Sequence, residues 1–182
     1  LETQNIKLKK DVYWFLIENI SEECLILDNE LLKLQNYINS SSTIEDIQKL
    51  IIQKNNYKAD NLFFICASGN YKLIIQDVST TVKTVDDSYE ILRSIKKFHQ
   101  ILTKVVTDKE NYNLDTLVNV YLPKYLFMKK EIFKEILRKI NIKKITKILK
   151  LLQKTELLLR KNSMQHLEII ERFLLNFAKI IK

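Results

Sequence analysis

Glycine and proline are almost absent from this 182-residue chain, which has one residue of each. β-Hairpins and strand-rich folds need Gly, Asn-Gly or Pro turns in quantity, so the sequence argues against all-β and doubly wound α/β folds. A phosphate-binding loop and a dinucleotide-binding fingerprint each need at least two glycines, because the backbone must approach the phosphate closely. We therefore expect an all-α protein without a glycine-rich nucleotide site.

Cysteine and histidine are also scarce, with two residues of each. Cys24 and Cys66 stand far apart in apolar sequence, and His99 and His166 are isolated, so no metal-ligand spacing and no Cys–His pair is evident. We expect both cysteines to be reduced core residues. We also expect no catalytic residue, no cofactor and no metal site, which makes an enzyme the least favoured function for the chain itself.

Long hydrophobic runs are missing as well. Apolar stretches such as residues 61–67 are far shorter than the ~20 residues that cross a bilayer. The chain opens on Leu1-Glu2-Thr3-Gln4, which is polar and acidic, unlike a secretory leader, and lacks an initiating Met. We expect a cytoplasmic, soluble piece of a longer chain that has no membrane partner.

Positive charge is present in excess, with 30 Lys and Arg against 22 Asp and Glu, a net charge of +8. Nearly all of it is Lys, and Lys, Asn and Ile are abundant while Ala is scarce, as an AT-rich coding genome would produce. Arg is the residue expected for bidentate phosphate or base contacts. The charge therefore permits a nucleic-acid partner without demonstrating one.

Apolar residues recur every three or four positions along nearly the whole chain, which is the period of an amphipathic helix. Thr43 is expected to cap a helix with acidic residues in its first turn, and Gly69 to end another in a left-handed cap. The expected helices cover residues 8–19, 21–38, 44–51, 60–68, 70–78, 86–106, 114–121, 126–140, 142–160 and 163–181.

The polar segment Asn55-Asn56-Tyr57-Lys58 is the best candidate boundary between two parts of the chain. We expect a small three-helix subdomain over residues 1–56 and a helical bundle over residues 57–182.

Five segments carry a resemblance to one family. Residues 29–38, Asn-Glu-Leu-Leu-Lys-Leu-Gln-Asn-Tyr-Ile, resemble the "nELeKLalY" signature of the bacterial DNA polymerase III delta subunit, although Leu32 replaces the second Glu. Residues 42–51, 62–70, 91–102 and 155–175 resemble the motifs that follow it, in the same order. The signature positions that we expect to matter for packing are Glu30, Leu31, Lys33, Leu34, Gly69 and Arg93. For Glu30 and Lys33, a surface ion pair and subdomain packing stay open.

The resemblance implies a small helical AAA+ lid at residues 1–56 followed by a collar domain at 57–182, which serves oligomerisation. The delta subunit is a non-catalytic part of the clamp loader, which loads the sliding clamp onto primed DNA during replication, within a DNA-directed DNA polymerase (nucleotidyltransferase) holoenzyme. Its partners would be the delta-prime and tau/gamma subunits, reached through the collar. The domain that contacts the sliding clamp is not part of the match.

One basic feature stands above the background. Lys143, Lys147, Lys150 and Lys154 recur at intervals of four, three and four residues, which places them on one helix face, opposite Ile142, Ile145, Leu149 and Leu152. This lysine stripe is either a solvated face or a DNA-facing surface for primer–template DNA. The alternative functions are a stand-alone basic helical adaptor and a nucleic-acid-binding module. An AAA+-like domain encoded immediately upstream would favour the clamp-loader hypothesis.

Overall fold

The computed structural model describes residues 8–20, 24–51 and 57–182. Within these ranges the protein consists of ten α-helices and two short 3₁₀ helices, with no strand, so the all-α prediction is confirmed. The expected helix start at Ser21, the side chain of Cys24 and the boundary residues Asn55 and Asn56 lie outside what the structure describes. The chain divides into two compact units. The first contains the described residues up to Tyr57 and also Pro123–Met128; the second contains Lys58–Leu122 and Lys129–Lys182.

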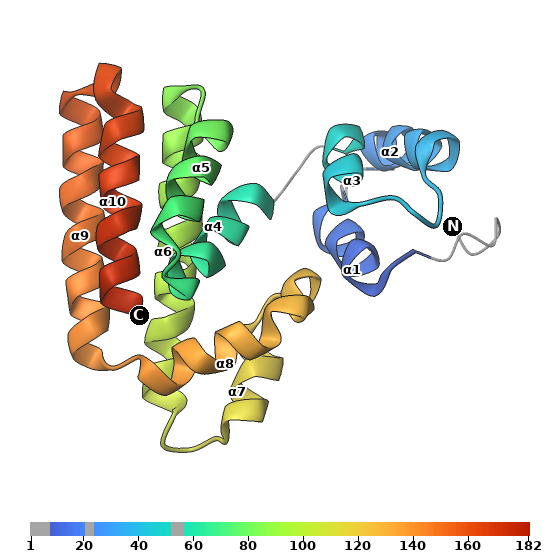
Figure 1. Ribbon diagram of the computed structural model, residues 1–182. Helices are drawn as coiled ribbons and strands as arrows, with labels where there is room; N and C mark the ends of the chain where they lie inside the picture. The colour runs from blue at the N-terminus through green and yellow to red at the C-terminus, as the bar shows by residue number, and fades with distance from the viewer. Residues whose placement is uncertain (1–7, 21–23, 52–56) are drawn as a thin grey trace. The chain divides into compact units, whose positions relative to one another are not determined.

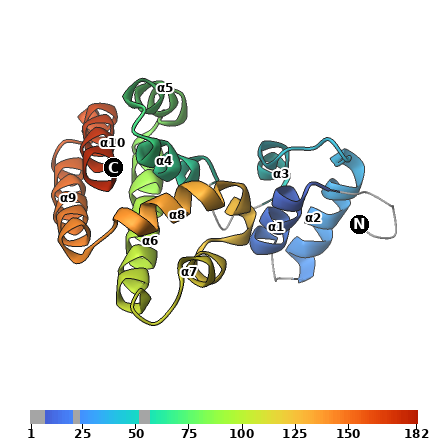
Figure 2. The ribbon, with the colours of Figure 1, turned by 60° about the horizontal axis from the view of Figure 1, so that its bottom comes forward.

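The first unit is built on α1 (Lys10–Asn19), α2 (Cys24–Tyr37) and α3 (Ile44–Leu50). Helix α3 packs against both α1 and α2 (Figure 2). The predicted cap is present: the Asp46 backbone N–H donates to Thr43, and the Asp46 carboxylate accepts from the Thr43 N–H at 2.9 Å. The buried hydrophobic side chains that this part of the chain contributes are Val12, Phe15, Leu16, Leu34, Ile38, Ile44, Ile47 and Ile51.

Residues distant in sequence complete the core of this first unit. They belong to the 3₁₀ helix η2 (Lys124–Lys129). The ring of Tyr125, 2% exposed, packs edge-on against Phe15 with centroids 5.5 Å apart. The Lys124 ammonium lies 4.2 Å from the centre of the Trp14 ring, a cation–π distance. A single boundary at residue 56 does not account for this segment.

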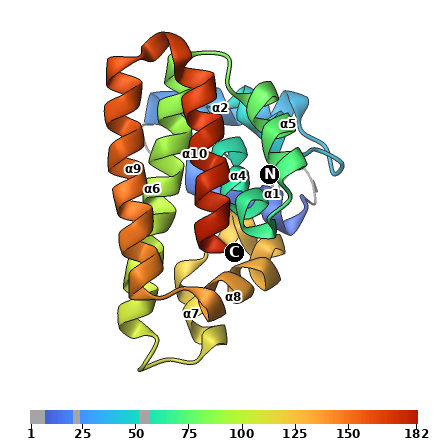
Figure 3. The same cartoon turned by 60° about the vertical axis from the view of Figure 1, so that its left-hand side comes forward.

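The second unit has eight elements. They are α4 (Tyr57–Ser68), α5 (Tyr71–Thr81), α6 (Val85–Asp108), α7 (Leu114–Tyr121), α8 (Lys130–Lys139), α9 (Ile142–Lys161), the 3₁₀ helix η3 (Ser163–Gln165) and α10 (His166–Ile181). The long helices α6, α9 and α10 lie side by side (Figures 1 and 3). Helix α5 packs on α10, and α7 packs on α8.

Aromatic rings from four helices form the centre of the second unit. Phe63 of α4 stacks on Phe98 of α6, with centroids 4.1 Å apart and planes 8° from parallel. Phe64 meets Phe98 edge-on at 5.5 Å, while Phe133 of α8 and Phe177 of α10 close the cluster from the other sides. Each such pair contributes roughly 0.5–1.5 kcal/mol beyond the burial of its area. Helix α4 is thereby fixed against α6, α8 and α10.

Side-chain caps begin four helices of the second unit, α5, α6, α7 and α9, and a glycine ends α4. Gly69 has φ +71°, which confirms the left-handed cap, and Asn70 then accepts from the Leu73 N–H to start α5. Thr84 and Asp87 form a capping box at the start of α6. The helix expected from Leu126 instead begins at Lys130, because Leu126 has non-helical angles and 124–129 is a 3₁₀ helix.

Candidate interaction surface on helices α9 and α10

Helix α9 displays the lysine stripe to solvent. Asn141 caps the helix by accepting from the Lys144 N–H at 2.9 Å. From there, Lys143, Lys147, Lys150 and Lys154 are all exposed and follow one face. They span twelve residues, and the eleven steps from Lys143 to Lys154 correspond to about 16 Å at 1.5 Å per residue. The prediction that they share a solvent-facing side of one helix is confirmed.

The buried face of α9 differs from the expected one. Ile142 is 71% exposed and Leu149 is 41% exposed, so these two residues do not belong to the core. The side chains opposite the stripe are Ile148, Leu152, Thr155 and Leu159, each 7% exposed or less. Helix α9 packs on both α6 and α10. The side of α9 that faces these two helices is therefore the side that is buried.

The lysines of the stripe have no acidic partner among the residues that the structure describes, since no described carboxylate lies within 4.0 Å of any of the four ammonium groups. Lys144, on the same helix, behaves differently: its Nζ donates to the Ile181 carbonyl at 3.4 Å. Partial burial, with a smaller effect from Lys139, lowers the pKa of Lys144. The stripe is therefore a solvent-exposed row of lysines, whereas Lys144 packs against the end of α10.

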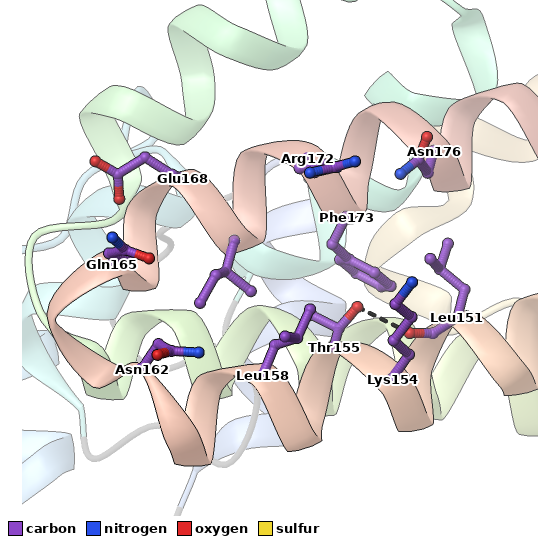
Figure 4. Close-up of a pocket in the computed structure, with 11 residues that line it drawn as sticks. Leu151, Lys154, Thr155, Leu158, Asn162, Gln165, Glu168, Arg172, Phe173 and Asn176 are labelled. Carbon is purple, nitrogen blue, oxygen red and sulfur yellow. Dashed lines mark hydrogen bonds between the residues drawn. The ribbon is translucent and has the colours of Figure 1, made fainter.

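A groove of about 480 Å³ lies between α9 and α10 and meets the stripe at Lys154. Figure 4 shows side chains of both helices directed into it, with Phe173 pointing from α10 toward α9. The Thr155 hydroxyl donates to the Leu151 carbonyl at 2.8 Å, which satisfies that donor within α9. The groove is lined by Leu151, Lys154, Thr155, Leu158, Asn162, Gln165, Glu168, Ile169, Arg172, Phe173 and Asn176. We call this feature the α9/α10 groove.

The other flank of α9 carries a second groove, of about 380 Å³, against α6. Two of its charged lining residues, Arg93 and Glu156, are paired: Arg93 binds Glu90, and Glu156 accepts from Arg160 at 2.6 Å. Glu168 and Arg172 have the same spacing on α10 as Glu156 and Arg160 on α9, but they do not form an ion pair in the described structure. Arg172 therefore adds to the α9/α10 groove a cation that has no ion-pair partner among the described residues.

The family-signature residues do not converge on one site. On α2, Glu30 and Leu34 are buried, Leu31 is half-buried and Lys33 is exposed. Gly69 forms the corner between α4 and α5, and Arg93 lies exposed on α6. Each residue is placed by its own helix, so the set describes structural positions spread along the chain and no shared binding site.

One contact was not foreseen from the sequence. The Ser88 hydroxyl lies 3.1 Å from Nδ1 of His166, 78 residues away, although His166 looked isolated. A Ser–His pair can form a nucleophile and its base, but Ser88 is 0% exposed, so no substrate can reach it. The contact joins the start of α6 to the start of α10. No local signal reveals it, because it depends on how these two helices pack.

The carboxylate next to Ser88 is held in its ionised form. Burial alone would raise the pKa of Asp87. Hydrogen bonds from the backbone N–H groups of Lys83 and Thr84, at 2.9 and 2.7 Å, outweigh that effect and lower it, with help from His166. Asp87 thus works as a capping group that also faces the His166 ring.

Other chemistry is sparse over the described ranges. Cys66 is a free, buried thiol whose pKa is raised by desolvation. No three His, Cys, Asp or Glu side chains within those ranges gather closely enough to hold a metal ion. None of the described helices combines the length and apolarity that a bilayer span requires. Among the described features, the surface around α9 carries the charged and apolar groups best suited to binding a partner.

No family model and no curated protein matches the sequence.

Proposed function

We propose that this chain is the lid and collar portion of a clamp-loader subunit of the DNA polymerase III delta type. In this role it catalyses nothing itself. It serves assembly of the ring that loads the sliding clamp onto primed DNA, with delta-prime and tau/gamma subunits as its partners, in the cytoplasm.

The observation that carries the proposal is the order of the five motifs on the elements of the fold. Residues 29–38 cover α2 from its second turn to the residue that follows it, and residues 42–51 cover α3 with its capping box. Residues 62–70 cover the end of α4 and the Gly69 corner, 91–102 lie in α6, and 155–175 span α9 to α10. Each motif therefore corresponds to a helix or a helix end, which supports reading the motifs as fold-determining signals of one family.

The arrangement of the second unit is compatible with an assembly role. Helices α6, α9 and α10 contain 24, 20 and 16 residues and present long rigid faces. Such faces can pack against helices of neighbouring subunits by ridges into grooves, and this requires no catalytic group. Exposed apolar side chains on α9, including Leu157 at 59% exposure, would be covered in such a complex.

Reconstitution tests this proposal. The chain is mixed with purified delta-prime and tau/gamma subunits of its own source, and the masses of the species are measured by size-exclusion chromatography with light scattering. We expect a stable complex that contains the chain. An unrelated helical protein of similar charge serves as the control. Failure of the chain to enter the complex at micromolar concentrations would contradict the proposal.

Sequencing upstream of Leu1 gives an independent check, since an AAA+-like domain is expected there.

A nucleic-acid-binding module is the second candidate, because the lysine stripe is exposed and has no described acidic partner. Binding of this kind would be independent of sequence and would weaken with salt, by a log–log slope of about −0.9 per phosphate neutralised on duplex DNA. The test is titration of primer–template DNA at several salt concentrations, with a variant that carries Glu at all four stripe positions. Equal binding by both proteins would exclude the stripe as a DNA contact.

A further inference from the structure

We propose that the α9/α10 groove, together with the lysine stripe that continues from it along α9, binds an acidic amphipathic helix of a partner protein. The inference rests on the assembly role proposed above, whose partner class it defines, but it does not require that the partner be a clamp-loader subunit.

The first argument is the apolar lining of the groove. Leu151 and Leu158 come from α9, and Ile169 and Phe173 come from α10. Leu158 is 39% exposed, whereas Phe173 is 2% exposed and forms part of the floor. Recognition of a helix in a groove uses such a lining, because the apolar stripe of the incoming helix needs a concave apolar counterpart.

The second argument is charge complementarity. Lys154 of the stripe lines the groove on α9, and Arg172 adds a cation from α10. Glu168 is the one acidic residue of the lining, and it lies beside Gln165 toward the end where α9 and α10 are connected (Figure 4). Beyond Lys154, the other three lysines of the stripe continue the positive charge along α9, and together these cations select an acidic partner.

The third argument is the spacing of the charges. The stripe repeats at four, three and four residues, so a partner helix with Asp or Glu at the same intervals can lie along it over about 16 Å. Residues farther along the same partner helix would then face the groove with apolar side chains at i, i+3 and i+4 spacing. The stripe thus predicts a pattern that can be written into a peptide.

The structure favours a protein helix over DNA for this surface. Leu157 is 59% exposed within the stripe face and Leu158 borders it, and neither side chain can contact phosphate favourably. The α6/α9 groove is a weaker candidate, because Arg93 in its lining is already bound to Glu90 and its lining includes the carboxylate of Glu156. The α9/α10 groove combines an open apolar lining with unpaired cations.

The experiment uses the full chain and a designed probe. The probe is a fluorescent helical peptide of roughly 20 residues, with Glu repeating at four, three and four residues and Leu at the adjoining face. A scrambled peptide of identical composition keeps the charge and removes the pattern, and a duplex DNA of similar length tests the competing ligand. Binding is followed by fluorescence anisotropy at several salt concentrations.

Two variants test the two halves of the surface. Lys147→Glu with Lys150→Glu should weaken binding of the patterned peptide about tenfold or more, and Leu158→Ala should weaken it about fivefold. Each has a matched control: Lys72→Glu with Lys104→Glu changes the charge equally on exposed positions of α5 and α6, and Leu73→Ala removes an equally exposed leucine, at 39%. The controls should bind like the original chain. Circular dichroism verifies that every variant is folded.

Preference for the patterned over the scrambled peptide, lost in the two α9 variants alone, supports the proposal. Equal binding of the two peptides would overturn it, since only general charge attraction would then operate. Binding of DNA with a steep salt dependence and without any peptide preference would overturn it in favour of a nucleic-acid surface. No peptide binding would also overturn it. If the chain still assembles with clamp-loader subunits in that case, the proposed function stands and only this groove is excluded.

Discussion

Lys97 on α6 places its Nζ 2.7 Å from Oδ2 of Asp60 on α4, in the interior of the second unit. Asp60 is 2% exposed, and its other oxygen accepts from the Ser94 hydroxyl at 2.6 Å. The Lys97 side chain is 32% exposed, so one end of the pair reaches water and the other does not. This asymmetry determines what the loss of either partner should cost.

Removing the cation should destabilise the protein more than removing the buried carboxylate. Lys97→Met leaves a buried carboxylate without this counter-charge and should lower the free energy of unfolding by about 3 kcal/mol. Asp60→Asn leaves Lys97 able to turn toward solvent and should cost roughly 1–2 kcal/mol. The double variant should cost less than the sum of the two. Urea denaturation of the four proteins measures all three quantities, and a larger loss for Asp60→Asn than for Lys97→Met would contradict the argument.

The Gly69 corner should be sensitive to any side chain with a Cβ. At φ +71°, a β-branched residue is strained, and Gly69→Val should lower the free energy of unfolding by roughly 1–2 kcal/mol, with a smaller loss for Gly69→Asn. An added Cβ would also lie 2.9 Å from Cδ of Lys182. Lys182→Ala separates the two effects: the loss persists in this background if backbone strain causes it. Thermal unfolding provides the measurement, and an unchanged Tm in Gly69→Val would exclude the strain.

Local signals explain why much of the fold could be predicted. Thr43, Gly69 and Asn70 act on backbone groups within four residues of themselves, so the sequence around each is sufficient to identify a helix end. The period of apolar residues likewise depends on neighbours along one helix. The all-α fold and the lysine stripe follow from these short-range patterns.

Long-range packing explains the rest. Ile142 and Leu149 fit the apolar period of α9 yet remain exposed, because two neighbouring helices decide which strip of α9 is buried. The contact of Ser88 with His166 depends on the packing of α6 and α10. The α9/α10 groove could not be predicted for the same reason. Five of its eleven lining residues come from α10, and no motif in either helix indicates that the two helices pack together.

His99 should make stability dependent on pH near neutrality. Its ring is partly buried, which lowers its pKa, while its contact with the Ile145 carbonyl, at 3.3 Å from Nε2, acts in the opposite direction and is weaker. The folded state therefore binds a proton less readily than the unfolded chain, whose histidines have pKa values of about 6.5. Stability should be fully present above that value and decline as the pH falls through it toward the lower pKa of the folded state.

The check is a comparison with His99→Gln. Urea unfolding is followed from about pH 7.5 downward through the ordinary histidine pKa of about 6.5. The free energy of unfolding of the original chain should fall more steeply than that of the variant over this range. Parallel curves would show that His99 does not contribute to the dependence.

Cys66 should be unreactive while the protein is folded. Its side chain is 0% exposed, so a reagent cannot reach the sulfur, and burial raises its pKa, which disfavours the reactive thiolate. In a Cys24→Ser background, labelling by a chromogenic disulfide reagent should be slower in the native protein than in guanidinium chloride by roughly a hundredfold or more, because reaction requires unfolding. Rapid native labelling would place Cys66 at the surface.

The inclusion of Pro123–Met128 in the first unit has a consequence for synthesis of the chain. A ribosome delivers residues in order, and N-terminal parts of a protein generally fold first. Here the contact between Phe15 and Tyr125 can form only after Tyr125 has been synthesised, and Tyr125 follows α4, α5, α6 and α7 in the chain. Helix α1 thus completes its packing only after α4 to α7 have been synthesised, and the first unit cannot reach its final core until more than half of the second unit has been translated.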